Sequence, residues 1–353
     1  FGFAYRLRDT SVIRGGYGVF TEQIGYFARV QGGGPFQISE TYINQVVDGK
    51  PVFGFPNPFP ASLGAAVIAS QSVVGFPVRM DNGSIHQFNL TLEQQMGDLG
   101  FRLSYIGSRS RGLNYNLGIN KPQPSLVPFT QARRPYPQFI GVAMAQNDGR
   151  TNYNSLQLEA QRKVGALLTF DVHYTLQSHL SEFLNLENPY NHKFWNRETF
   201  STRHRAVINA MIDIPVGKGR RFLSTVPAVV DRILGGWRLT TISTFTSGQF
   251  FGPSFSGSDP SNTNTVGGLA DRICDGNLPR GERTIDRWFN PACFAAPPAG
   301  RFGNSGVNIL KRPGYNLHHM SVAKEFKLGD RFNLEYVASA SNVFNHPHFN
   351  PPV

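Results

Sequence analysis

Apolar and polar residues alternate along most patterned segments of the chain with a period of two, and helical periodicity is almost absent. The clearest segment runs from 168 to 177. Leu, Phe, Val and Tyr occupy its even positions, and Thr, Asp, His and Gln occupy its odd positions. Because successive side chains of a strand point to opposite faces, this pattern predicts a strand with one apolar and one polar face.

The same alternation predicts about ten strands, most of them longer than the roughly 5–6 residues common in globular proteins. Strands of about 9–11 residues are what a tilted crossing of a bilayer requires. The predicted strands are 1–8, 11–20, 85–96, 101–105, 156–161, 166–177, 206–214, 237–245, 317–326 and 332–344.

The connections between these strands alternate in length. Short turns are expected at 9–10, 97–99, 163–166 and 328–330, and long ones at 21–83, 109–150, 178–201 and 251–313, with an intermediate one at 215–235. If consecutive strands are antiparallel, all short turns fall at one end of the sheet, as in outer-membrane barrels with short periplasmic turns and long extracellular loops. A soluble β-sandwich or jelly roll, the alternative, has no reason to sort loops by side. The prediction is an all-β, antiparallel transmembrane outer-membrane β-barrel, partial and of about ten strands.

Composition agrees with this fold. The chain has 353 residues, only 16% of them charged, and 37 glycines. No run approaches about 18 consecutive apolar residues, so a helical membrane span is excluded. The net charge of +11 raises nucleic acid as a partner. The arginines, however, are spread along the chain rather than gathered in one basic patch, so no nucleic-acid partner is expected.

Cys274 and Cys293 lie 19 positions apart in a long segment rich in Gly, Asn, Asp and Pro. An even cysteine count in one loop suits a disulfide in an oxidising compartment, so the pair is a candidate loop disulfide. A zinc site is disfavoured because no CxxC motif or nearby pair of histidines accompanies them. The alternative is two unrelated free thiols.

Other motifs offer little chemistry. The glycine-rich Gly15–Gly18 segment lies within a strand pattern and no helix follows it, so it does not predict a phosphate site. His318 and His319 are adjacent on a strand and point to opposite faces, whereas His346 and His348 flank a proline in a loop and could converge on a metal. No GxSxG elbow, HExxH helix or defined carboxylate pair is present. We therefore expect no catalytic, cofactor-binding or metal residues, no cofactor, and no enzyme activity.

Several segments together resemble one family, the Oar-like TonB-dependent receptors of the acidobacterial type. They are RGGYGVF at 14–20, RHRAVINAMIDIPVGKGRRF at 203–222, LGGWRLTTISTFTSGQFF at 234–251, the run 288–326 and ASNVFNHPHF at 340–349. The resemblance implies that residues 1–353 are the C-terminal part of the β-barrel domain of such a receptor. We see no plug, no N-terminal carboxypeptidase-regulatory-like domain, no signal peptide and no closing aromatic strand, so this segment alone is not expected to transport.

In such a barrel the polar strand faces are expected to line the interior, solvated by channel water or touching the plug, with substrate contact as the alternative. They comprise Gln157, Glu159, Gln161, Asp171, His173, Thr175, Gln177, Arg205 and Asn209. Aromatic residues near strand ends are expected in the interfacial girdles: Tyr17, Phe20, Trp237, Phe250 and Phe251.

The resemblance implies a receptor or transporter in the outer membrane of a Gram-negative bacterium, binding a solute at its loops and passing it through the lumen. Its expected partners are outer-membrane lipid and lipopolysaccharide, an unknown solute, and the TonB complex, reached only through the missing N-terminal regions. The alternative is a surface adhesion or export-linked receptor without import activity. The third alternative is a secreted soluble β-protein or a carbohydrate-active enzyme, which the lack of any catalytic motif disfavours. The substrate class cannot be read, because specificity resides in the loops.

Overall fold

The computed structural model describes residues 1–23, 46–51, 56, 72–162, 167–327 and 331–350. Within these ranges the chain is strands, turns and loops with one α-helix, α2 (Ala228–Leu234). None of the described helices is long and apolar enough to cross a membrane.

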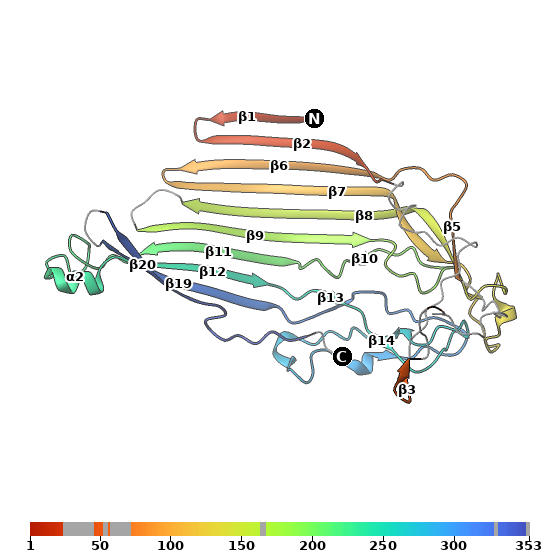
Figure 1. Cartoon of the computed structure of the whole chain (residues 1–353). Helices are drawn as coiled ribbons and strands as arrows, with labels where there is room; N and C mark the ends of the chain where they lie inside the picture. Colours follow the sequence, from red (N-terminus) through yellow and green to blue (C-terminus); the bar gives the residue numbers. More distant parts are fainter. Residues whose placement is uncertain (24–45, 52–55, 57–71, 163–166, 328–330, 351–353) are drawn as a thin grey trace.

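One sheet of twelve described strands dominates the molecule, and ten of them form an antiparallel series in which each strand pairs with the next of the series (Figure 1). This confirms the predicted all-β class and strand number. Its order is β1 (Gly2–Arg8), β2 (Ser11–Thr21), β6 (Ser84–Met96), β7 (Leu99–Gly118), β8 (Gly141–Arg162), β9 (Leu168–Ser181), β11 (His204–Asp213), β12 (Trp237–Thr246), β19 (Tyr315–Lys327) and β20 (Asn333–Ala340).

The connections sort by length as predicted. Short turns join β1 to β2 and β6 to β7 at one end of the sheet, and the long loops lie at the other end (Figure 1). The expected turns at 163–166 and 328–330 lie outside the described residues. The intermediate connection 214–236 also lies at the short-turn end and carries α2, which the alternation pattern did not predict.

The prediction of one long loop from Arg109 to Arg150 was wrong. β7 and β8 have 20 and 22 residues, about twice the length that a bilayer crossing needs, and continue as a hairpin beyond the other strands. Register shifts interrupt this extension beside Gly112, which adopts a φ of 70°. The bulges break the period-two pattern, which hid the strands, and the loop itself is only 119–140.

Several short strands lie at the end of the sheet where the long loops are. β5 (Ser72–Gly75) adds in parallel to β8, and β10 (Asn196–Arg197) pairs with β9. The remaining two-residue strands form separate pairs: β3 (Val46–Val47) with β4 (Lys50–Pro51), β13 (Phe250–Phe251) with β18 (Leu310–Lys311), β14 (Ser254–Phe255) with β15 (Gly268–Leu269), and β16 (Asp271–Arg272) with β17 (Phe294–Ala295). Three 3₁₀ turns lie there as well: Gln131–Arg133, Arg280–Glu282 and Pro291–Cys293.

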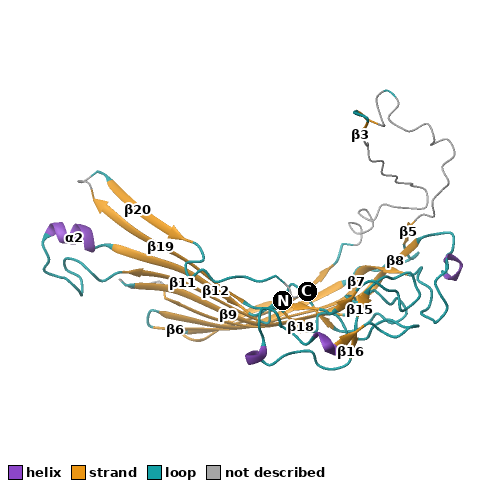
Figure 2. Cartoon of the chain, turned by 90° about the horizontal axis from the view of Figure 1, so that it is seen from below, coloured by secondary structure: helices purple, strands orange, loops and turns teal. Residues whose placement is uncertain are grey.

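The sheet is curved (Figure 2), and the register shows that its two faces differ in character. The register places Leu158 beside Leu103 and Tyr174, so that apolar side chains share one face across neighbouring strands. These side chains are exposed, Leu103 at 42% and Leu158 at 44%. The buried apolar residues that the structure describes all lie at the loop end instead: Tyr115, Leu117, Ala145, Phe250, Ala270, Leu278, Cys293 and Leu310. The series of ten strands therefore has an apolar surface but no apolar core of its own.

Candidate functional site: a charged sheet face below interlocked loops

The register gathers the predicted polar residues on one face of the sheet. Glu159 on β8 lies opposite both Arg102 and His173, and Asp171 on β9 lies opposite Gln161 and Asn209. The remaining predicted residues lie in other rows of the same face: Gln157, Thr175, Gln177 and Arg205. The prediction that these nine side chains share a face is confirmed.

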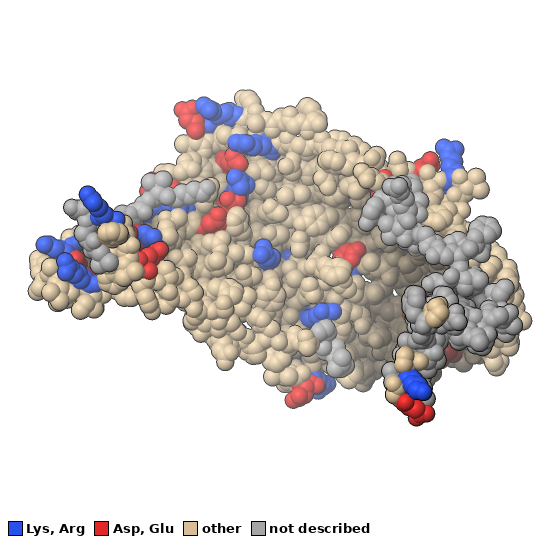
Figure 3. Space-filling view, in the orientation of Figure 1, with Lys and Arg blue, Asp and Glu red and all other residues tan. Residues whose placement is uncertain are grey.

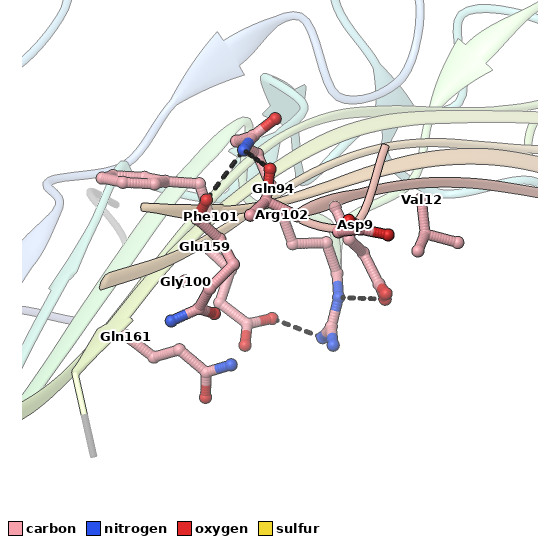
Figure 4. Close-up of a pocket in the computed structure, with 11 residues that line it drawn as sticks. Asp9, Val12, Gln94, Gly100, Phe101, Arg102, Glu159 and Gln161 are labelled. Carbon is pink, nitrogen blue, oxygen red and sulfur yellow. Dashed lines mark hydrogen bonds and ion pairs between the residues drawn. The ribbon is translucent and has the colours of Figure 1, made fainter. Parts of the chain in front are cut away.

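An ion-pair chain crosses five strands of this face, and we call it the polar ladder. Its members are Arg14, Glu93, Arg102, Glu159, His173 and Asp171. Arg14 lies 3.2 Å from Glu93, and Arg102 joins Glu93 at 3.3 Å to Glu159 at 2.7 Å. Charged side chains gather near the short-turn end of the upper strands in Figure 3. In Figure 4 the guanidinium of Arg102 points toward the carboxylate of Glu159.

The charges of Arg14, Glu93, Arg102 and Glu159 alternate in sign, and their attraction holds these side chains together. Glu159 is only 15% exposed and lies between Arg102 and the ring of His173, whose Nδ1 is 3.7 Å away. Isolated exposed pairs contribute at most about 1 kcal/mol each. Removing one member, however, leaves a half-buried charge without its partner, so the ladder positions its side chains more firmly than separate pairs would.

Three ladder residues also form a possible cation site. One ligand atom each of Glu159, Asp171 and His173 lies within 4.8 Å of the others. Carboxylate and imidazole donors suit divalent metals. Arg102 already pairs with Glu159, and His173 Nε2 contacts Asp171, so both carboxylates of this cluster have partners within the chain. We assign no metal to it, and the expectation of no metal site stays a prediction.

A hollow of about 220 Å³ lies beside the ladder near the short turns (Figure 4). Its lining is mainly polar, with Asp9, Gln94, Gln95, Arg102, Glu159 and Gln161 among its residues. Carboxylates, amides and one guanidinium can bind water, a polar solute or a polar protein surface through hydrogen bonds.

The sequence analysis did not identify Arg14, Glu93 and Arg102, although each lies at a position of its strand whose side chain points to the polar face. What sequence could not supply is the register, which puts Arg102 between two carboxylates on neighbouring strands. Pairing between strands that are far apart in sequence is needed to align the three.

At the opposite end the long loops interlock, and we call this assembly the loop cap: residues 119–140, 182–203 and 247–314 with the hairpin extension of β7 and β8. Lys121 Nζ donates to the carbonyl of Glu187 at 2.8 Å, and the Tyr190 hydroxyl donates to the carbonyl of Lys121 at 2.7 Å. Arg133 donates to the carbonyl of Asn262 at 2.8 Å, which joins the first loop to the third. Burial lowers the pKa of Lys121 and raises the pKa of Tyr190.

A cavity of about 570 Å³ opens between these three loops. Phe194, Trp195 and Phe302 supply aromatic surface, and Trp195 is 42% exposed. Side-chain amides surround them, among them Asn185, Asn188 and Asn191. Apolar surface with a few polar groups around it is typical of small-molecule sites.

The loop cap also contains both cysteines. The Cα atoms of Cys274 and Cys293 lie 4.8 Å apart, within the range that a disulfide requires, and their sulfurs are at bonding distance. The disulfide remains a proposal that thiol labelling can test.

The histidines do not form the metal site considered from sequence. His346 lies beside His318, with ring centroids 5.7 Å apart, whereas His348 lies beside Tyr315 at 5.2 Å. The two histidines around Pro347 therefore turn to different neighbours. His318 and His319 fall on opposite faces, as their adjacency predicted.

The predicted aromatic girdle is wrong for three residues. Phe250 and Phe251 form β13 inside the loop cap, where Phe250 is 8% exposed and lies under Arg197. Phe20 pairs with Ile85 in a row of the polar face. Tyr17 and Trp237 lie in rows of the apolar face, as a girdle requires. Where an aromatic side chain lies depends on which face of the strand its position points to and on how the loops pack. An aromatic residue near the end of a strand is not by itself evidence for a girdle.

The sequence matches the family model described as "Outer membrane beta barrel domain" over residues 1–353. No curated protein matches it. Similar solved structures include the outer membrane transporter YddB from Escherichia coli, with a TM-score of 0.48 and 8% identity over 96% of this chain and 35% of that chain. The FrpB iron transporter from Neisseria meningitidis has a TM-score of 0.46 and 10% identity over 98% and 34%. The ferric citrate transporter FecA has a TM-score of 0.42 and 13% identity over 98% and 33%. The chain thus spans about a third of the length of these structures.

Proposed function

The chain belongs to the outer membrane beta-barrel domain family, and on that premise we propose that it is the barrel segment of a TonB-dependent receptor. In the full-length protein the loop cap binds a solute, and the polar face of the sheet lines the passage that the solute follows. The observation that carries this proposal is the division of one sheet into an apolar face and a charged face, with a cavity at its long-loop end.

The apolar face suits lipid and the polar face suits a water-filled interior. A barrel in the outer membrane alternates apolar outward residues with polar inward ones. The polar ladder then lies on the inner wall toward the periplasmic turns. There its carboxylates and arginines can hold a polar plug surface by charge pairs, or contact a solute during passage.

Further strands must cover the two edges of this sheet. Among the described residues β1 and β20 pair only with β2 and β19. Open strand edges are not tolerated in hydrocarbon, because lipid satisfies no backbone polar group. We propose that other strands of the full-length receptor close the barrel, and that a plug domain gates it through the TonB complex.

Uptake by cells that carry the full-length gene tests import. Labelled ferric siderophore, oligosaccharide, peptide and cobalamin are offered in turn to the wild type and to a gene deletion. The proposal expects accumulation of one class, lost in the deletion and on collapse of the inner-membrane proton gradient. If the deletion strain accumulates every solute class as well as the wild type does, import by this protein is contradicted. If the same protein then mediates attachment of cells, the adhesion receptor is favoured.

A pair of variants connects uptake to the loop cavity. Trp195→Ala removes an aromatic wall of the cavity and should lower apparent affinity for the accepted solute about 2- to 13-fold, as an aromatic pair contributes about 0.5–1.5 kcal/mol. Val266→Ala removes a 72% exposed side chain of the same loop cap and should leave uptake unchanged. Equal affinity in both variants would place the solute elsewhere.

A further inference from the structure

A short helix lies at the periplasmic end of the barrel, and its surroundings point to a ligand that the transport proposal does not use. α2 ends at Leu234, just before β12 begins at Trp237 (Figure 1). Trp237 pairs with Lys324 on β19, which pairs with Tyr336 on β20. The next row toward the membrane centre contains Leu239 and Val322, so Lys324 lies on the apolar, lipid-facing side of the sheet.

A lysine on the lipid face needs a partner, and α2 provides it. Lys324 Nζ donates to the carbonyls of Ile233 and Gly235, at 2.9 and 2.6 Å. Trp237 Nε1 donates to the same Ile233 carbonyl at 3.0 Å. Lys324 is 3% exposed, and its ammonium also lies over the ring of Trp237 at 5.2 Å. A cation at a helix C-terminus is favourable, so Lys324 fixes α2 against the outer side of the wall.

The free surface of α2 is apolar. Val229 and Ile233 are one helical turn apart and 69% and 64% exposed, and Leu234 is 45% exposed. Phe222 and Leu223 in the preceding turn are 54% and 47% exposed. The lipid-facing surface of the barrel continues into this patch at the level of Trp237, a residue type enriched at membrane interfaces.

The segment that contains α2 is also rich in basic residues. Residues 214–236 contain four basic residues and one acidic residue, Asp231. The Asp231 carboxylate accepts a hydrogen bond from the backbone of Lys218, so it is already used within the turn. The four basic residues are exposed: Lys218, Arg220, Arg221 and Arg232.

We propose that residues 214–236 form a binding site for an anionic phospholipid of the periplasmic leaflet of the outer membrane. Its acyl chains cover Val229 and Ile233, and its phosphate lies among Lys218, Arg220, Arg221 and Arg232. Apolar residues beside basic ones are what an interfacial helix uses to lie on an anionic membrane surface. The inference rests on membership of the outer-membrane family and not on import of any solute.

The depth of α2 is measured in the full-length protein, reconstituted in nanodiscs of phosphatidylethanolamine and phosphatidylglycerol at 3:1 with brominated acyl chains. Val229→Cys carries a fluorophore in a background without other reactive thiols. The proposal expects its emission to fall at least twofold relative to unbrominated lipid, as for a label at Leu90→Cys on the wall. A label at Ile285→Cys in the loop cap is the unquenched control. Quenching of the Val229 label no greater than this control overturns the proposal.

The headgroup is tested by native mass spectrometry of phospholipid retained after extraction from the mixed nanodiscs. Replacing the four basic residues by glutamine should lower retained phosphatidylglycerol at least about tenfold while phosphatidylethanolamine is unchanged, because the anionic headgroup loses the cations that attract it. A matched variant replaces four exposed basic residues at the loop end by glutamine: Lys50, Arg79, Arg280 and Arg287. Equal loss in both variants, or none in either, overturns the anionic site. Heat-modifiable gel mobility confirms that each variant is folded, and solute uptake, measured separately, reports on transport alone.

Discussion

The barrel wall and the loop cap are stabilised in different ways, although one chain passes repeatedly between them. The wall has no buried apolar core among its described residues, and its large apolar side chains, such as Leu103 and Leu158, are exposed on one face. The loop cap contains the buried apolar residues, including Phe250 and Leu310, and binds its loops together with hydrogen bonds across long sequence separations. Within the described residues the wall is therefore held by pairing between strands and by ion pairs on its polar face, whereas the cap also has buried apolar side chains.

This contrast also separates stability from recognition. The wall needs only side chains of the right polarity at alternating positions, so many sequences can satisfy it. The cap needs particular partners, such as Lys121 with the carbonyl of Glu187. The solute site that we propose in the cap can therefore vary while the wall is kept.

The largest effect should come from charge on the lipid face of the wall. Leu156→Arg places a guanidinium near mid-membrane and should cost about 2–4 kcal/mol of unfolding free energy in vesicles, because an arginine is poorly solvated there. The neighbouring Gln157→Arg lies on the polar face and should cost less than 1 kcal/mol. Guanidinium titration of the full-length protein in lipid measures both, and equal costs would contradict the assignment of the faces.

Loss of the proposed disulfide should affect the cap alone. Replacing Cys274 and Cys293 by serine should destabilise the closed loop by about 3 kcal/mol, since a bridge over this separation restricts the unfolded segment. Proteolysis within 274–293 should accelerate while heat-modifiable mobility of the barrel is retained. Two labelled thiols in the oxidised, denatured wild type would refute the disulfide, and loss of barrel mobility would show that wall and cap are coupled.

Removing the centre of the polar ladder should have a smaller effect. Arg102→Ala removes the cation that lies between Glu93 and Glu159, although Arg14 still pairs with Glu93, and we expect a cost of about 1 kcal/mol in unfolding free energy, because the guanidinium is 44% exposed. Arg79→Ala breaks an ion pair whose members are 87% and 75% exposed, and should change stability by less than about 0.5 kcal/mol. If both variants lose the same amount, the ladder is not a network.

The smallest effect is a pH dependence confined to the cap. Burial lowers the pKa of Lys121 in the folded protein below its ordinary value of 10.5. At a pH between the lowered pKa and 10.5, the unfolded loop therefore binds more protons than the folded loop. Loop stability should therefore rise as pH increases through this window, as measured by the proteolysis rate of residues 119–140 relative to an unstructured peptide. Lys121→Met should abolish the slope. An unchanged slope in that variant would assign it to another group.

Much of the wall could be predicted from the sequence, because period-two alternation is a local property. The segment around Asp171 and His173 shows its two faces in the residue order alone. The extension of β7 and β8 could not be predicted, because bulges beside Gly112 interrupt the alternation. Only part of the polar ladder could be predicted from the sequence. Glu159 and His173 were assigned to the polar face, but their common neighbour Arg102 is fixed only by strand register.

By itself the sequence determined the strands, their two faces and the sorting of connections by length, since each depends on residues close together in the chain. The resemblance of its segments added the family. Only the tertiary structure decided which charges meet in the ladder, which loops interlock around the cavity, and that α2 covers Lys324 on the apolar face of the sheet. These contacts join residues tens to more than a hundred positions apart, and their geometry depends on strand register and loop packing that no local pattern encodes.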